Sequence, residues 1–226
     1  MDDTDPATIF AICTAQRREL ADLLDGLSDA ELDSPSLCAG WSVRVVAAHL
    51  AGALDGSLAG FVAAVVRNRG SLDRANDVLA HRRALEPTPE LVAALRDGAD
   101  KKLSPPMIGP RGPMTDVLVH SGDICLSLGR RFDPPPGAVE IALNFLCGRA
   151  PGFVPRRRLL GLALAPTDTS RRWGAGSEIV GKAADVMMAV GGRTATLTRL
   201  AGPGAAILQR RLPPAPTPPG PPQPDR

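Results

Sequence analysis

The first 150 residues of this chain repeat apolar side chains at the three- and four-residue spacing of amphipathic helices, and capping residues divide the repeat into segments. Asp5 with Pro6 begins the first segment, and Ser28 with Glu31 has the spacing of a capping box. Ser42 is expected to cap a long helix from residue 43 to about residue 67, and further helices are expected over 72–85, 89–101, 114–128 and 136–147. Long helices joined by short loops predict a helical bundle over residues 1–150.

The pattern changes after Pro155. Residues 160–164 alternate large and small side chains as a strand does, and residues 177–180 predict a second short strand after a turn over 168–173. A helix is expected over 183–190, where two glycines end it. We therefore expect an α+β fold, with a small α+β domain over residues 151–212 that packs on the bundle and a disordered proline-rich tail over residues 213–226.

Composition excludes several classes of protein. Lys and Arg number 26 against 24 Asp and Glu, which is too balanced for a dedicated nucleic-acid binder. No apolar run reaches the roughly 18 residues that would cross a membrane, and the acidic start of the chain is unlike a secretory signal, so we expect a cytoplasmic protein. We also expect a monomer.

The four cysteines are far apart in sequence and are expected to be free thiols that pack as small apolar groups. Glycine-rich dinucleotide and phosphate loops and a serine nucleophile elbow are all missing from the sequence.

The most informative residues surround His120. Asp116 lies four residues before it and Asp123 three residues after it, inside an apolar helical segment. At about 100° per residue, the three side chains fall within roughly 60° of one another on one helix face. A carboxylate and an imidazole at this spacing can chelate one metal ion. The alternative is a core histidine that is hydrogen-bonded to Asp116, which itself lies near a helix start where carboxylates are favoured.

His49 is the second unusual histidine, because its helical neighbours include Gly52, Ala53 and Gly56. Small side chains around an imidazole leave room for a close helix crossing or for a cavity. His49, Asp116 and His120 would then form a metal site with two nitrogens and one oxygen, leaving a coordination position open as in catalytic zinc sites. Asp123 would orient one imidazole N–H. A boundary position without a ligand role is the alternative for His49. His81 is interpreted as a surface residue, and Trp41 and Trp173 as packing residues.

Several blocks of the sequence resemble the maleylpyruvate isomerase family of mycothiol-dependent enzymes, within the wider DinB-like metal-binding four-helix bundles. These blocks are SLCAGWSVRVVAAHL at 36–50, LDRANDVLAHRR at 72–83, GPRGPMTDVLVHSGDI at 109–124 and APTDTSRRWGAGSEIVGKAADVMMAVGGR at 165–193. The resemblance implies a DinB-like bundle followed by a domain similar to sterol carrier proteins. It implies a divalent metal, usually zinc, bound by His49, Asp116 and His120, and a catalytic arginine in the C-terminal domain, for which Arg193 is the candidate.

One residue departs from the family pattern, because the isomerases carry glutamate where this chain has Asp116. The shorter side chain requires the metal to lie closer to the helix, to bind through water, or to use Asp123 instead. The donor set also suits nickel, iron or manganese.

The resemblance implies an enzyme that uses a low-molecular-weight thiol, mycothiol or a similar molecule, for isomerisation or thiol transfer on a small electrophile. Two other functions stay open: a non-catalytic protein that binds an apolar ligand, and a hydrolase that uses metal-bound water.

Overall fold

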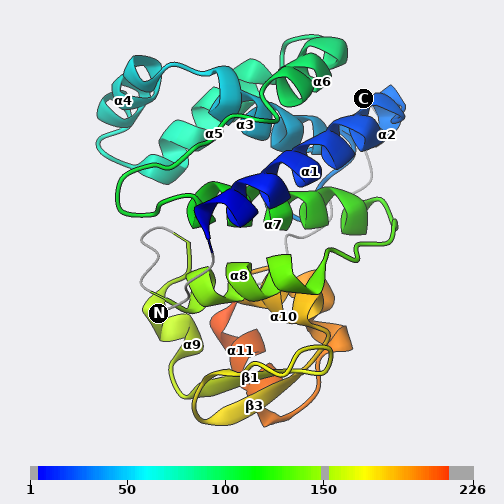
Figure 1. The fold of residues 1–226 in the computed structure, drawn as a ribbon, viewed down its shortest axis with the longest axis vertical. Helices are drawn as coiled ribbons and strands as arrows, with labels where there is room; N and C mark the ends of the chain where they lie inside the picture. Colours follow the sequence, from blue (N-terminus) through cyan, green and yellow to red (C-terminus); the bar gives the residue numbers. More distant parts are fainter. Residues whose placement is uncertain (1–4, 149–152, 214–226) are drawn as a thin grey trace, which may run out of the picture.

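The computed structural model describes residues 5–148 and 153–213 and has an upper helical part and a lower α+β part (Figure 1). In the described part the elements, in chain order, are α1 (Pro6–Asp25), α2 (Asp29–Asp33), α3 (Val43–Asp55), α4 (Leu58–Arg67), α5 (Leu72–Arg83), α6 (Thr88–Asp97), α7 (Arg111–Ser127), α8 (Pro136–Cys147), α9 (Arg156–Leu159), β1 (Leu162–Pro166), β2 (Trp173–Gly174), β3 (Ser177–Gly181), α10 (Ala183–Val190), the 3-10 helix η1 (Thr194–Arg199) and α11 (Pro203–Arg211). The predicted α+β class is confirmed. The predicted tail beyond residue 213 lies outside the described residues.

Four helices close the bundle in a ring. Helix α1 packs against α6 and α7, and α3 packs against the same two helices from the opposite side. Helix α5 covers the outer face of α3, and α4 packs on α5. The predicted caps explain where these helices begin: Asp5 accepts a hydrogen bond from Ala7, and Ser28 with Glu31 forms the complete capping box.

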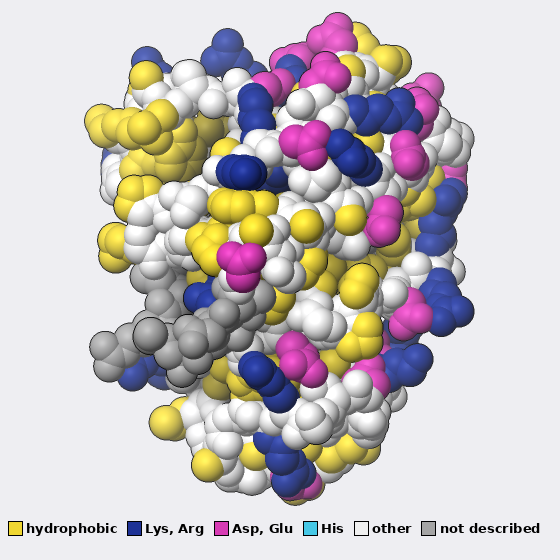
Figure 2. All heavy atoms as spheres, viewed as in Figure 1, with side chains coloured by type: hydrophobic (Ala, Val, Ile, Leu, Met, Phe, Trp, Pro, Cys, Tyr) yellow, Lys and Arg dark blue, Asp and Glu magenta, His cyan; other side chains and the backbone are white. Residues whose placement is uncertain are grey.

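The expected long helix over 43–67 is wrong, because the chain breaks at Gly56 and starts again as α4. Gly56 adopts an extended conformation, and the Ser57 side chain accepts from the backbone N–H of Gly60, which caps a new helix. Helix α4 leaves the bundle and exposes the apolar side chains of Leu58, Val62 and Val66. Helix α4 lies at the upper left of Figure 1, and Figure 2 shows a hydrophobic area there in the same view.

The lower part contains a three-stranded sheet of order β2-β1-β3. Strand β1 is antiparallel to β2 and parallel to β3, with Leu164 opposite both Trp173 and Ile179. Helices α10 and α11 pack against β1 and β3, while α8 contacts α7, α10 and β2 and so lies between the two parts. The two predicted strands are present, whereas β2, α9, η1 and α11 were not predicted.

A single hydrophobic core runs through both parts of the molecule. It includes Leu24 of α1, Leu118 of α7, Leu143 of α8 and Met188 of α10. Helix α8 contributes buried residues to this common core. The predicted division into domains at residue 150 stays a prediction. Among the described residues, none of the helices is long and apolar enough to cross a membrane.

Leu118→Ala tests the packing of the bundle core. Leu118 is fully buried on α7, so we expect the substitution to lower the free energy of unfolding by about 2–5 kcal/mol. Urea denaturation measures the change. The matched control is Leu58→Ala on α4, where the side chain is 78% exposed and a change within about 0.5 kcal/mol is expected. Equal effects of the two substitutions would contradict this description of the core.

Candidate metal centre

Helix α7 places three of the predicted site residues on one face, as the sequence spacing requires. Asp116 and His120 are four residues apart, and their Oδ1 and Nε2 atoms lie 3.5 Å from each other. Asp123 lies on the next turn, and its Oδ2 is 2.9 Å from Nδ1 of His120. The Asp116 side chain keeps some solvent access at 29% exposed, whereas the Asp123 side chain is 0% exposed.

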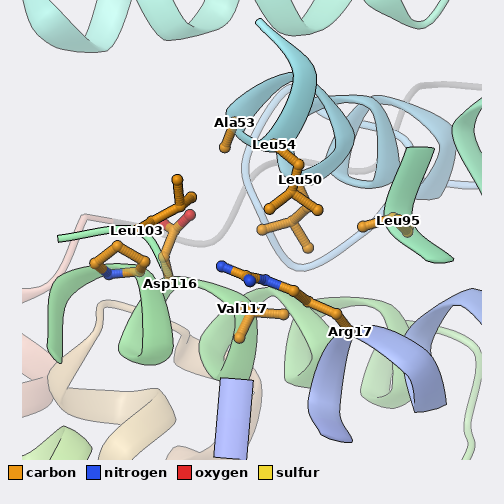
Figure 3. Close-up of a pocket in the computed structure, with 9 residues that line it drawn as sticks. Arg17, Leu50, Ala53, Leu54, Leu95, Leu103, Asp116 and Val117 are labelled. Carbon is orange, nitrogen blue, oxygen red and sulfur yellow. The ribbon is translucent and has the colours of Figure 1, made fainter. Parts of the chain in front are cut away.

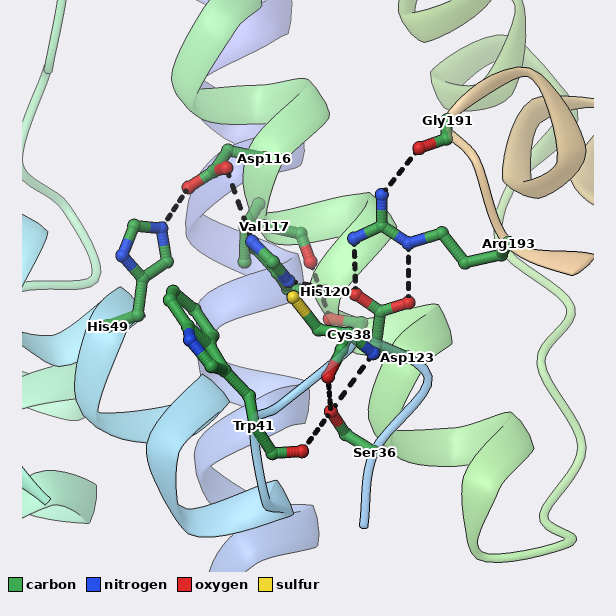
Figure 4. Close-up of polar contacts among 11 residues, drawn as sticks. Ser36, Cys38, Trp41, His49, Asp116, Val117, His120, Asp123, Gly191 and Arg193 are labelled. Carbon is green, nitrogen blue, oxygen red and sulfur yellow. Dashed lines mark hydrogen bonds and ion pairs between the residues drawn. The ribbon is translucent and has the colours of Figure 1, made fainter. Parts of the chain in front are cut away.

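Helix α3 brings His49 to the same place from the opposite side of the bundle. Its Nε2 atom lies 3.2 Å from Oδ2 of Asp116, and the His49 and His120 ring centres are 5.1 Å apart. The carboxylate of Asp116 therefore stands between two imidazoles (Figure 4). Its aspartate side chain, although one methylene shorter than glutamate, reaches both rings.

The donor atoms of His49, Asp116 and His120 all lie within 4.8 Å of one another. Around a tetrahedral zinc ion with bonds of about 2.0–2.1 Å, donor atoms are separated by roughly 3.3 Å. The distances of 3.2 Å and 3.5 Å at Asp116 are close to that separation. Since Nδ1 of His120 is occupied by Asp123, its Nε2 is the nitrogen left to bind a metal. The three residues thus fit a divalent metal.

The charges in the site stabilise one another against burial. Burial raises the pKa of Asp116, but His49 and then His120 outweigh this effect and lower it to about 2. Burial also opposes a charged imidazole at His49, and Asp116 overcomes that opposition and raises the pKa of His49 above its ordinary value. The negative charge of Asp116 therefore stabilises a positive charge beside it, and either a proton or a metal ion can supply that charge.

Arg193 approaches from the C-terminal part and forms a two-point ion pair with Asp123. Its Nε donates to Oδ1 at 2.8 Å and its Nη2 to Oδ2 at 2.6 Å, while its Nη1 donates to the carbonyl of Gly191. Burial penalises both charges, but the pairing outweighs it, raising the pKa of Arg193 and lowering that of Asp123. Because all three guanidinium nitrogens are engaged, these contacts support a positioning role. The catalytic role of Arg193 stays a prediction.

Sequence reasoning missed Trp41, whose indole lines the site. The ring stacks on His120 with centres 5.9 Å apart and a 17° angle between planes, and it contacts His49 at 5.2 Å. Its Nε1 donates to Oδ1 of Asp77 at 2.8 Å. Trp173, by contrast, is a packing residue as interpreted, with its Nε1 donating to Asn144.

The loop before α3 holds Trp41 in this position. The Ser36 hydroxyl donates to the carbonyl of Trp41, and the backbone N–H of Leu37 donates to the carbonyl of Asp123. The loop is thereby attached to α7. No short-range pattern in the sequence reveals this contact. Trp41 lies one residue before the cap of α3, and His49 lies about two turns into the same segment.

Cys38 was interpreted only as a packing residue, and it belongs to a second group, with His120 and Asp123, whose donor atoms also lie close together. Burial raises the pKa of the Cys38 thiol to about 11, and both oxygens of Asp123 accept hydrogen bonds from Arg193. This second group therefore fits a metal less well than the group around Asp116. His81, interpreted as a surface residue, is half exposed and contacts Asp77.

Comparison with known proteins identifies a similar family and a similar fold. Residues 13–104 match the family model of the mycothiol maleylpyruvate isomerase N-terminal domain. The crystal structure of a mycothiol-dependent maleylpyruvate isomerase is similar with a TM-score of 0.60 at 15% identity, covering 90% of this chain and 95% of that one. A histidine-to-alanine variant of a mycothiol-dependent maleylpyruvate isomerase gives a TM-score of 0.50 at 16% identity with the same coverage. No curated protein matches the sequence. The resemblance seen in the sequence is confirmed, and the structures share a fold.

His120→Ala tests the metal centre directly. Removing one of three ligands is expected to abolish stoichiometric binding, so that about one equivalent of metal in the parent falls to a small fraction in the variant. Mass spectrometry of purified, zinc-equilibrated protein measures the content. His81→Ala is the matched control, because its imidazole is 48% exposed and outside the donor group. Equal metal content in parent and His120→Ala would show that these residues do not form the site.

Asp123→Asn tests the support of His120. Losing the carboxylate that orients an imidazole is expected to weaken zinc affinity by about 10- to 100-fold. Competition with a chromogenic chelator gives the affinity, and Asp133→Asn, at an exposed ion pair with Arg131, is the control. Since Arg193 loses its partner, a melting curve must accompany the titration. Unchanged affinity in folded Asp123→Asn would refute the orienting role.

Proposed function

We propose, for a chain whose residues 13–104 match the mycothiol maleylpyruvate isomerase N-terminal domain, an enzyme that uses a low-molecular-weight thiol of the mycothiol type on a small electrophile. The observation that carries the proposal is the convergence of two imidazoles on the Asp116 carboxylate, at 3.2 Å and 3.5 Å. Isomerisation is the reaction favoured by the similar fold, and thiol transfer is the related alternative.

His49, Asp116 and His120 would hold a divalent cation, for which zinc fits the donor set. Such a cation supplies the thiolate form of the thiol at neutral pH, where a free cysteinyl thiol with a pKa of about 8.5 is mostly protonated.

The residues around the ligands keep this arrangement fixed. Asp123 holds the Nδ1 side of His120, and Arg193 holds both oxygens of Asp123, so rotation of the imidazole would break its hydrogen bond to a carboxylate that is itself fixed. Trp41 stacks on the face of His120 and makes a tilted contact with His49, and the Nε2 atoms of both imidazoles are directed at Asp116. Ligands held in place before the substrate arrives lose little entropy when it binds.

The reaction is tested by supplying zinc-loaded protein with mycothiol and maleylpyruvate. Isomerisation returns the thiol unchanged, whereas transfer consumes one thiol for each product molecule. We expect product formation only when thiol and metal are both present, with at least about a 100-fold loss in His120→Ala, measured by chromatography and thiol titration. His81→Ala should keep the parent rate.

Other outcomes would identify the alternatives. Formation of hydrolysis products without thiol would indicate a metal-dependent hydrolase. A co-purified lipid together with metal-free, inactive protein would indicate an apolar-ligand carrier and would refute the proposed reaction.

A further inference from the structure

Arg17 is a buried cation that no carboxylate neutralises. Its exposure is 4%, and within residues 5–148 and 153–213 the ion pairs of the structure do not include it. Every other strongly buried charge of the site is paired: Asp116 with two imidazoles, and Asp123 with Arg193. Burying a charge without an opposite charge is unfavourable, so such a residue requires an explanation.

The hydrogen bonds of Arg17 use one side of its guanidinium. Nη1 donates to the carbonyls of Ala99 and Lys101, at 3.0 Å and 2.8 Å, which attaches the segment after α6 to α1. In the described part of the chain, Nε and Nη2 donate to no partner, yet neither is among the fully enclosed, unsatisfied atoms. These two nitrogens present a pair of N–H donors of the kind that binds a carboxylate in two-point fashion.

The guanidinium lines a pocket together with Asp116. The pocket is small, about 20 Å³, and opens to solvent, and its remaining walls are apolar side chains of α3, α6 and α7 and the loops beside them: Leu50, Ala53, Leu54, Leu95, Leu103, Pro113 and Val117. Figure 3 shows Arg17 extending from α1 between Leu50 and Val117. The guanidinium of Arg17 and the carboxylate of Asp116 therefore line the same pocket.

We propose that Arg17 is an anion-recognition residue which binds a carboxylate group of the electrophilic substrate. Asp116 forms its ion pairs with His49 and His120 and not with Arg17, and both Arg17 and Asp116 line the open pocket, through which a carboxylate group could reach the guanidinium. A carboxylate held by Arg17 would place the reactive carbon of a short substrate towards Asp116, while the apolar walls exclude water and strengthen the charge pairing. The inference rests on the proposed function for its substrate, but carboxylate binding itself is independent of turnover.

The pKa direction agrees with this assignment. Burial lowers the pKa of the Arg17 guanidinium, and the nearby Cys13 thiol only partly offsets the effect. A bound carboxylate would supply the missing negative charge.

Carboxylate binding is measured with maleate as the probe, on metal-free protein so that the metal ligands cannot account for it. We expect calorimetric titration to show maleate binding in the parent and a loss of about 10- to 100-fold in affinity for Arg17→Gln, with Arg17→Lys intermediate. Arg18→Gln is the matched control, because Arg18 is the next residue of α1, exposed and paired with Asp100. It should bind maleate as the parent does, and neutral dimethyl maleate should bind none of the proteins.

A measurement on the parent protein covers the case in which Arg17→Gln does not fold. The Nε–H signal of Arg17, assigned by its loss in Arg17→Lys, should shift in nuclear magnetic resonance spectra as maleate is added. Parent protein without maleate binding, an unshifted signal, or equal affinity in folded Arg17→Gln would each overturn the inference. These results leave metal content and thiol-dependent turnover of a neutral electrophile untouched, so the proposed function would fail or stand separately.

Discussion

The buried ion pair between Asp123 and Arg193 is the interaction on which the arrangement of the site depends. It joins a helix of the bundle to the segment after α10, and its carboxylate also accepts from His120. Removing one partner of such a pair leaves an uncompensated buried charge and typically costs about 3–5 kcal/mol. The C-terminal part therefore does more than cover the bundle, because it supplies the charge that keeps Asp123 ionised and His120 in one orientation.

A second set of contacts acts from the other side of the site. The loop before α3 is attached to α7 through Leu37 and Asp123, and it places the Trp41 indole across both imidazoles. His49 and His120 belong to different helices and would repel each other if both were charged. Asp116 lies between the two rings, whose centres are 5.1 Å apart, and Trp41 stacks on His120 and makes a tilted contact with His49. The ligand geometry is thus fixed by neighbours on three separate segments.

The helical spacing in the sequence was sufficient to predict that Asp116, His120 and Asp123 share a face, because three- and four-residue separations fix relative directions on any helix. The meeting of His49 with Asp116 was a hypothesis from small neighbours and from the family resemblance, and its geometry is now visible. Trp41 and Arg17 could not be found in this way, since each reaches the site through tertiary packing. The break at Gly56 was missed because apolar periodicity continues across it, and β2 was missed because two residues carry no periodicity.

Asp116 belongs both to the donor group and to the wall of the pocket that contains Arg17. Its shorter side chain keeps the negative charge close to α7, where His49 must approach from α3 to meet it. A longer glutamate at this position would extend from α7 into the pocket and reduce the space between the metal ligands and Arg17. Under the role proposed for Arg17, the aspartate would therefore have a physical consequence beyond metal affinity, because its shorter side chain would keep the pocket beside the guanidinium free for an anionic group.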